Sequence, residues 1–199
     1  MLSRKTLVAG QPRRGADDAA VQILVVCTGN ICRSPYVAAL LQRALPDARV
    51  TSAGTAAMVG RQPVVPVADV LADLGAGTSA PARQLRRSMV RRADVIVAMT
   101  HTQRATVVQI VPKSGARTFT LKELARTAAH LTPPGDDLRT SLTALLARTA
   151  LDVGASARDH DDDLDDPYGG PPEGYVRMMS EADLAVGAIV AALRAETLR

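Results

Sequence analysis

Residues 22–35 read QILVVCTGNICRSP, and this stretch decides the class of fold that we expect. Residues 22–26 are a continuous apolar run, which is typical of a strand buried on both faces. A loop rich in Gly, Asn and Ser follows, and Pro35 stands near the first turn of a predicted helix over residues 35–45. A buried strand that passes through a tight loop into a helix is the beginning of a βαβ unit.

The same alternation continues along the chain. Further strands are predicted at 48–52, 94–99 and 117–121, and further helices at 67–74, 84–93, 101–111, 122–131, 137–151 and 173–195. We expect Gly75 to close the helix over 67–74. The apolar positions expected in the last helix include Met178, Leu184, Ile189 and Leu193. Strands that alternate with helices form right-handed crossovers, so the pattern predicts a parallel sheet with helices on both faces.

Length and composition indicate one globular domain. The chain has 199 residues, of which 47% are hydrophobic and only 2% aromatic, so the core must be aliphatic. Residues 1–20 lack an apolar period and read as a disordered N-terminal tail ahead of a domain over 21–199. The net charge of +4 is too small to predict a nucleic-acid or membrane partner.

The cysteines predict a reducing compartment. Cys27 and Cys32, the two cysteines of the sequence, are too close together to join distant elements, so a secreted disulfide framework is not expected. No apolar stretch approaches the length of a membrane span, and no signal-peptide apolar region precedes Val21. We therefore expect a cytoplasmic protein.

The loop after the first strand has the features of a phosphate site with a nucleophile. Backbone N–H groups of residues 28–33 can converge on one point, where the following helix adds the positive end of its dipole. Gly29 and Asn30 tolerate the left-handed backbone of a tight loop, and Arg33 offers a planar fork of donors. The same field favours the thiolate of Cys27, which could attack a bound phosphoryl group in line.

Other interpretations of this loop fit less well. A lone cysteine at a strand end is usually a packing residue, but here the C-x5-R spacing, the preceding strand and the following Ser-Pro helix start all agree. A nucleotide P-loop would need Gly-Lys-Ser/Thr, which the sequence lacks. Gly75 and Gly77 follow a helix rather than a strand, so a dinucleotide fingerprint also fails.

Four segments resemble the low-molecular-weight protein tyrosine phosphatase family, bacterial type. They are CTGNICRSP at 27–35, TSAGT at 51–55, RADVIVAM at 92–99 and DPYGG at 166–170, in the family's order across most of 22–195. The resemblance implies one doubly wound α/β domain with four parallel strands in the order 2-1-3-4. It implies no cofactor and no metal. Compared with compact members of the family, this sequence has an extra helical segment near 132–158.

The resemblance also implies roles for individual residues. Cys27 would be the nucleophile, Arg33 would bind phosphate, and Asp166 would be the general acid and base. The acidic run over 159–166 by itself offers several carboxylates and could be a solvated loop, but the Asp-Pro-Tyr context selects Asp166. Asn30 and Ser52 would hold the loop in shape, and Ser34 would support the leaving thiolate. The full predicted phosphate and substrate site is Thr28, Gly29, Asn30, Ile31, Cys32, Ser34, Ser52, Met58 and Tyr168.

The same comparison bears on substrate and partners. Ile31 is typical of the phosphotyrosine branch, whereas the arginine-phosphatase branch favours Thr, and residues 56–60 resemble members linked to exopolysaccharide kinases. The implied partner is a phosphotyrosine-bearing protein, such as a cognate tyrosine kinase, and we expect a monomer. Cys32 could either form a reversible disulfide with Cys27 or simply pack beneath the loop.

Three alternatives remain beside phosphotyrosine hydrolysis. An arginine phosphatase would share the loop. An arsenate reductase would need further cysteines, and none follows Cys32. A silent phosphopeptide-binding module would not need Cys27, Arg33 and Asp166 together. Beyond the loop, a basic helix face is formed by Arg83, Arg86, Arg87, Arg91 and Arg92, which is either solvated or a docking patch for phosphorylated or acidic partners.

Overall fold

A parallel sheet forms the centre of the structure, a computed structural model that describes residues 20–75, 80–132, 137–156 and 161–194. The strands are β1 (Val21–Cys27), β2 (Ala48–Gly54), β3 (Val95–Ala98) and β4 (Thr118–Thr120). They run parallel in the order β2-β1-β3-β4. The predicted α/β class and the strand order 2-1-3-4 are confirmed.

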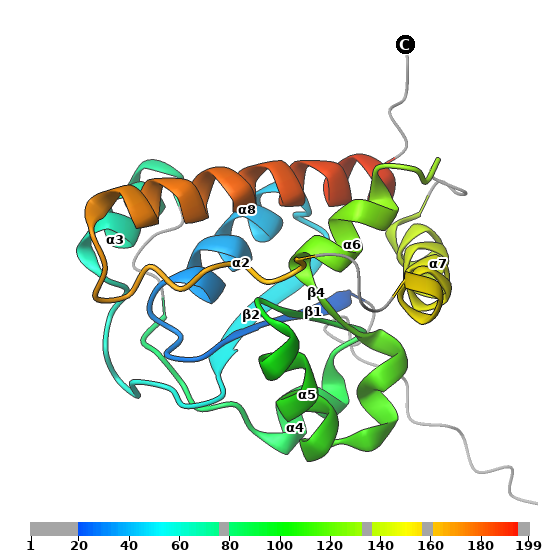
Figure 1. The fold of residues 1–199 in the computed structure, drawn as a ribbon, viewed down its shortest axis with the longest axis horizontal. Helices are drawn as coiled ribbons and strands as arrows, with labels where there is room; N and C mark the ends of the chain where they lie inside the picture. Colours follow the sequence, from blue (N-terminus) through cyan, green and yellow to red (C-terminus); the bar gives the residue numbers. More distant parts are fainter. Residues whose placement is uncertain (1–19, 76–79, 133–136, 157–160, 195–199) are drawn as a thin grey trace, which may run out of the picture.

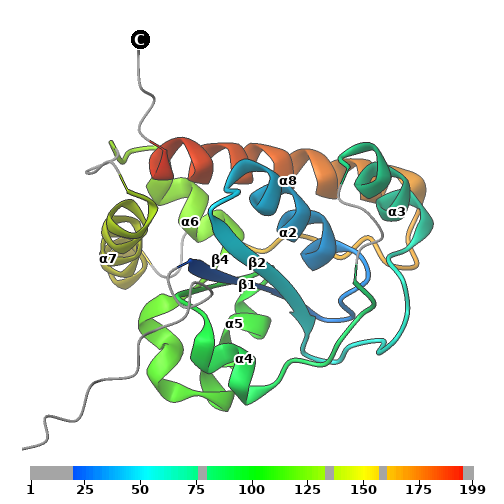
Figure 2. The same ribbon diagram turned by 180° about the vertical axis from the view of Figure 1, so that it is seen from behind.

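Helices cover both faces of this sheet (Figure 1). One layer holds α2 (Arg33–Ala44), α3 (Val65–Asp73), α6 (Leu121–Ala128) and α8 (Pro172–Leu193). The opposite layer holds α4 (Arg87–Arg92) and α5 (His101–Ile110), and the 3-10 turn η1 (Pro112–Arg117) leads into β4. The added segment forms α7 (Leu138–Ser156), which packs beside α6 at one end of the molecule (Figure 2).

The side chains of β1 explain why its sequence is continuously apolar. Ile23 and Val25 belong to the core beneath α2 and α8, while Leu24 and Val26 belong to the core on the α4 and α5 face. Successive side chains of a strand point to opposite faces, so a central strand between two helix layers needs apolar residues at every position. All four of these side chains are buried.

Several predicted elements differ from the structure in extent. The helix predicted over 84–93 begins only at Arg87, because Gln84 pairs with Gly54 in an isolated β-bridge and its side chain binds the backbone of Thr55 and Ala57. The helix predicted over 122–131 ends at Ala128. Gly75 does follow α3 with a positive φ of 68°, as expected for a helix end.

The prediction for Leu184 is wrong. It is 74% exposed, whereas the buried stripe of α8 runs through Met178, Ala182, Ala185, Val186, Ile189, Ala192 and Leu193. Three of these buried positions are alanines, and α8 packs against α2 and α6, so apolar character alone does not identify the buried face.

Some expectations fall on residues outside the described ranges. The predicted N-terminal tail lies there apart from Ala20, as do the first two residues of the acidic run over 159–166 and parts of the segment near 132–158. Among the described residues, no helix is both long enough and apolar enough to cross a membrane.

Candidate functional site

The loop between β1 and α2 lies at the carboxyl end of the sheet, where open α/β sheets place their functional groups. A pocket of about 180 Å³ opens there. It is lined by Cys27, Thr28, Gly29, Ile31, Cys32, Arg33, Ala56, Met58, Asp166 and Tyr168. The structure thus brings together residues that are up to 141 positions apart in the sequence, from Cys27 to Tyr168. The predicted residues Asn30, Ser34 and Ser52 lie behind the pocket rather than on its surface.

Asn30 holds the loop in shape. Its φ of 58° is the only positive value outside glycine among the described residues. Its side-chain amide donates to Ser34 Oγ and to Ser52 Oγ, each at 2.9 Å, and its Oδ1 accepts from the backbone N–H of Arg83 at 3.0 Å. A left-handed non-glycine residue is sustained only by surroundings that over-determine it, and these three bonds do so.

The Cys27 sulfur lies at the bottom of the pocket with donors around it. Its Sγ accepts from the backbone N–H of Asn30 at 3.2 Å and lies 3.0 Å from Ser34 Oγ. Only 2% of the residue is exposed, so the pocket is its route to a reactant.

Arg33 lines the pocket, and one of its N–H donors has no partner among the described residues. It is 3% exposed, its Nη1 donates to the carbonyl oxygen of Leu164 at 2.9 Å, and its Nη2 forms an ion pair with the Asp166 carboxylate. The Nε–H is buried and has no partner among the described residues. A buried unpaired donor is costly, and a phosphoryl oxygen in the pocket would satisfy it.

The segment that carries Asp166 is anchored to the rest of the protein. Leu164 donates its N–H to the carbonyl oxygen of Met99 at 2.8 Å. Asp163 Oδ1 accepts from the backbone N–H of His101 at 2.7 Å and lies 2.8 Å from its ring Nδ1. Asp162 forms an ion pair with Arg126. These contacts fix the segment immediately before the carboxylate that meets Arg33.

His101, Glu123 and Asp162 also lie close enough together to share a cation. Their carboxylates are already neutralised, because Arg104 pairs with Glu123 at 2.7 Å and Arg126 pairs with Asp162. A second oxygen of Glu123 accepts the N–H of Thr120 in a capping box at the start of α6. The cluster is therefore an ion-pair network that ties the acidic segment to α5 and α6.

We expect Asp163→Asn to reduce kcat by about threefold to tenfold, because a weakened anchor would let the segment that carries Asp166 move relative to the pocket. Asp165→Asn, an exposed neighbour in the same segment, is the matched control and should leave kcat unchanged. Steady-state kinetics on an aryl phosphate measure both variants. Equal kcat values for the two variants would show that the Asp163 contact does not position Asp166 for turnover.

Sequence reasoning missed Gln103 as a support of the loop. Its Oε1 accepts from the N–H of Met99 at 3.0 Å and its Nε2 donates to Thr28 Oγ1 at 3.1 Å. The side chain is buried, so both ends need these partners. A glutamine in the first turn of a helix gives no sequence signal for this role. Arg83, predicted as part of a helix face, likewise turns out to hold Asn30.

Gly54 at the end of β2 is a second hidden support. A Cβ at this position would meet the carbonyl oxygen of Thr28 and would lie 2.9 Å from Ala57 Cα, both backbone atoms. Glycine is required here because the loop of the nucleophile and the segment after β2 approach each other directly.

We expect Gly54→Ala to lower the free energy of unfolding by about 3 kcal/mol, since backbone rather than a flexible side chain must move. Gly187→Ala in α8 is the control, because a Cβ there meets nothing within 4 Å and alanine favours a helix. Urea denaturation measures both. A Gly54→Ala protein as stable as the Gly187→Ala protein would refute the close approach.

Cys32 is a buried free thiol directly before α2. Burial, reinforced by the negative charge of Asp166, raises the pKa of Cys32 to about 12. A thiol with this pKa stays protonated throughout the neutral range, and only the thiolate reacts with alkylating agents.

Iodoacetamide at pH 7 should therefore label Cys27 and leave Cys32 unmodified. Peptide mapping by mass spectrometry, with inorganic phosphate added as a protecting ligand, distinguishes the two cysteines. Modification of Cys32 at a rate equal to that of Cys27 would contradict the raised pKa of Cys32.

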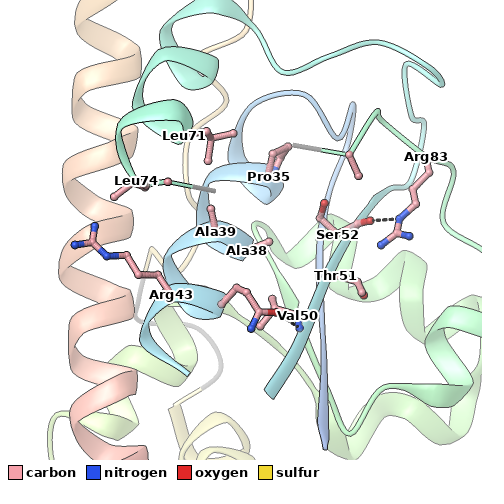
Figure 3. A pocket seen from close by; sticks show the side chains of 13 residues that line it. Pro35, Ala38, Ala39, Arg43, Val50, Thr51, Ser52, Leu71, Leu74 and Arg83 are labelled. Atoms are coloured by element: carbon pink, nitrogen blue, oxygen red, sulfur yellow. Dashed lines mark hydrogen bonds between the residues drawn. The ribbon is translucent and has the colours of Figure 1, made fainter. Parts of the chain in front are cut away.

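A larger groove of about 390 Å³ lies behind the loop, between α2, β2 and α3 (Figure 3). Ser52 and Pro35 form part of its wall, and Arg83 lies at its edge, where its Nε donates to the Ser52 carbonyl oxygen at 2.7 Å. Ala38, Ala39 and Leu71 supply apolar lining. The groove contains neither Cys27 nor Arg33, which both line the smaller pocket.

Comparison with known proteins identifies relatives of the same fold. The sequence profile of the low molecular weight phosphotyrosine protein phosphatase family matches residues 22–148. The protein-arginine-phosphatase of Geobacillus stearothermophilus is 30% identical over 176 residues, which are 88% of this chain and 97% of that protein. The probable low molecular weight protein-tyrosine-phosphatase EpsP of Ralstonia solanacearum is 42% identical over 103 residues, 51% of this chain and 71% of that protein.

Solved structures show the same relationship. The tyrosine phosphatase AmsI of Erwinia amylovora superposes with a TM-score of 0.63 at 26% identity, covering 87% of this chain and 93% of that one. The YwlE arginine phosphatase of Geobacillus stearothermophilus gives a TM-score of 0.62 at 30% identity, covering 85% and 90%. Fold and loop together define a phosphate-ester hydrolase. The chain belongs to the low-molecular-weight phosphotyrosine protein phosphatase family.

Proposed function

We propose that this protein removes the phosphoryl group from phosphotyrosine in other proteins, with Cys27 as nucleophile, Arg33 as phosphate ligand and Asp166 as general acid and base. The observation that carries the proposal is the pocket itself, in which these three side chains meet. Family membership supports the reaction type, and the positions of the side chains support their roles.

In the first step the Cys27 thiolate attacks phosphorus opposite the ester oxygen. The S–P bond forms, the P–O bond breaks, and a proton from the Asp166 carboxyl passes to the departing phenolate. Arg33 and the backbone N–H groups of the loop hold the equatorial oxygens, on which negative charge is concentrated. Asp166 must give up its present ion pair with Arg33 for this step, which frees the guanidinium for phosphate.

In the second step Asp166, now a carboxylate, takes a proton from water as the water oxygen attacks phosphorus. The S–P bond breaks, inorganic phosphate is formed and the thiolate of Cys27 is restored. Ser34 Oγ, 3.0 Å from the sulfur, can donate to the departing thiolate and so stabilise it.

The pocket walls favour an aromatic phosphate ester. Gly29 lies below the side chains of Ile31 and Met58, since a Cβ on it would lie 3.3 Å from Ile31 Cγ1 and 3.7 Å from Met58 Cγ. Tyr168, 51% exposed, stands at the rim. Aliphatic, thioether and aromatic groups pack well on a phenyl ring. The proposed partner is accordingly a phosphotyrosine-bearing protein, including a cognate tyrosine kinase.

Phosphoarginine is the second candidate substrate. The similarity to the Geobacillus arginine phosphatase extends over nearly the whole of that protein. Asp166, the one carboxylate among the described residues that line the pocket, could pair with a guanidinium group. Ile31 offers no hydrogen-bond partner for such a group, which favours phosphotyrosine.

The test is hydrolysis of two matched peptides that differ only in phosphotyrosine or phosphoarginine, with phosphate release as the measurement. We expect a kcat/KM at least about tenfold higher for phosphotyrosine, the equivalent of 1.4 kcal/mol. Ile31→Thr is the diagnostic variant and should shift the ratio toward phosphoarginine. A wild type that prefers phosphoarginine would overturn the proposed substrate, and one that hydrolyses neither would overturn the function.

A further inference from the structure

One side of the rim of the Cys27 pocket is built by two stretches of chain that lie against each other. Residues 55–64 follow β2 and supply Met58 to the pocket wall. Residues 80–86 run beside them, since the N–H of Ala82 donates to the carbonyl oxygen of Arg61 at 2.8 Å. The second stretch then leads past the end of β2 into α4 (Figure 2). The beginning of α4 is therefore joined directly to the surroundings of the pocket.

Helix α4 has one end near the pocket and one end far from it. Just before the helix, Leu85 donates its N–H to the carbonyl oxygen of Gly54, the last residue of β2. Just after the helix, Asp94 donates its N–H to the carbonyl oxygen of Gln22 in the first turn of residues of β1. Because β1 and β2 run parallel, these two contacts lie at opposite ends of the sheet. The helix therefore begins at the pocket's end of the sheet and finishes at the far end.

Three arginines at the pocket's end are exposed. They are Arg61 in the first stretch, Arg86 in the second and Arg87 at the start of α4. Their guanidinium groups have no hydrogen-bond or ion-pair partner among the residues that the structure describes. Neither 55–64 nor 80–93 contains an Asp or a Glu that could neutralise them. This side of the rim therefore carries positive charge that is available to a partner.

The opposite side of the rim is acidic. Asp166 lines the pocket there, and Asp165 is exposed beside it. A polypeptide that places its phosphotyrosine in the pocket therefore meets positive charge on one side of that residue and negative charge on the other. Arg33 and the loop amides already serve the phosphoryl group, so the charges of the rim act on the residues next to the phosphotyrosine.

We propose that Arg61, Arg86 and Arg87 form a docking surface for acidic side chains that neighbour the phosphotyrosine in the substrate protein. Carboxylates complement this surface in charge, and the planar fork of an arginine matches their two oxygens. The surface is continuous with the pocket, so one polypeptide can occupy both. The inference rests on the proposed function, and it defines the substrate more closely as phosphotyrosine in an acidic sequence.

The kinetic test uses phosphotyrosine peptides with two Glu residues before the phosphotyrosine, with two Glu residues after it, or with Gln at all four positions. Because the two sides of the rim differ in charge, one of the two acidic peptides should be preferred. Its kcat/KM should exceed that of the neutral peptide about fivefold, a size that exposed ion pairs can supply. The ratio should approach one in about 1 M salt, which screens exposed charges.

The variants compare the two ends of α4. Arg86→Gln/Arg87→Gln should lose most of the preference, and Arg61→Gln in addition should abolish it. Arg91→Gln/Arg92→Gln is the matched control, because it removes the same charge from the far end of the same helix and should keep the preference. The measurement is the ratio of kcat/KM values, in which any general change in the pocket cancels. Equal rates for all three peptides, or an equal loss of preference in the two double variants, would overturn the docking surface.

Binding to Cys27→Ser separates the docking surface from the proposed function. Calorimetric titration with the same peptides measures Kd without turnover, and the favoured acidic peptide should again bind about fivefold more tightly than the neutral one. Tighter binding of that peptide, with a wild type that hydrolyses none of the three, would overturn the function and leave the docking surface standing. Equal Kd values would overturn the docking surface. If Arg86→Gln/Arg87→Gln then abolished binding to vesicles that contain phosphatidylserine, these arginines would belong to a lipid-binding surface instead.

Discussion

Cys27→Ser should lower kcat by about 10⁴-fold or more, because a serine hydroxyl replaces the thiolate that must attack phosphorus. The hydroxyl fits the position of the sulfur near Ser34 Oγ and the N–H of Asn30, so the loop should keep its shape. The variant should therefore still bind phosphate while turnover is lost. Phosphate release from an aryl phosphate and a calorimetric titration with inorganic phosphate measure the two properties separately.

Cys32→Ser is the matched control for this variant. It makes the same chemical change five residues later, at a thiol that burial keeps protonated. We expect it to retain kcat within about tenfold, since its sulfur takes no part in the proposed steps. Comparable losses in the two variants would disprove the assignment of Cys27 as nucleophile.

Asp166→Asn should produce the second large effect, with a size that depends on the leaving group. Phenolate needs a proton as it departs, so kcat for phenyl phosphate should fall by roughly 10²–10³-fold, within the usual range for a general acid. Nitrophenolate leaves readily without a proton, so the loss on p-nitrophenyl phosphate should be smaller. The variant also removes the ion pair with Arg33, and a lower KM should accompany the lower kcat.

The comparison of the two leaving groups provides its own control. Equal losses on both substrates would mean that Asp166 positions the phosphate or the loop rather than donating a proton. Asp165→Asn, at the exposed neighbouring position, should leave both rates unchanged. This variant tests whether the loss of one negative charge is enough to explain the lower kcat of Asp166→Asn.

Much of the fold could be predicted because β1 alone carries a strong pattern. Side chains of β1 are buried beneath helices on both faces of the sheet, where a polar side chain would be unfavourable. The continuous apolar run therefore predicts both the strand and its burial on two faces. Gln84 shows where such reasoning fails. The sequence predicts that it begins a helix, but it forms a β-bridge with Gly54, a tertiary contact that the local sequence does not indicate. The prediction for Leu184 failed because apolar character did not indicate which face of α8 is buried: Ala182 and Ala185 are buried, whereas Leu184 is exposed.

Most of the pocket was also predictable, because the C-x5-R spacing indicates Cys27 and Arg33, and the family resemblance adds Asp166, Met58 and Tyr168. The residues behind it were not. Gln103 and Arg83 support the loop through bonds whose partners, Thr28 and Asn30, are 75 and 53 positions away in the chain. Nothing in the local sequence of either residue distinguishes it from a surface residue, so only the folded chain reveals the contact.

The ion pair between Arg33 and Asp166 makes the pocket selective for ligand charge. An incoming monoanion such as chloride brings no more negative charge to Arg33 than the Asp166 carboxylate that it must displace. A phosphoryl dianion brings twice the charge and reaches Arg33 Nε, which has no partner among the described residues, together with the amides of the loop. In the resting enzyme the Asp166 carboxylate thus competes weakly with incoming anions for Arg33. We expect the pocket to bind phosphate dianions in preference to monovalent anions, which are far more abundant, although both are small enough to enter.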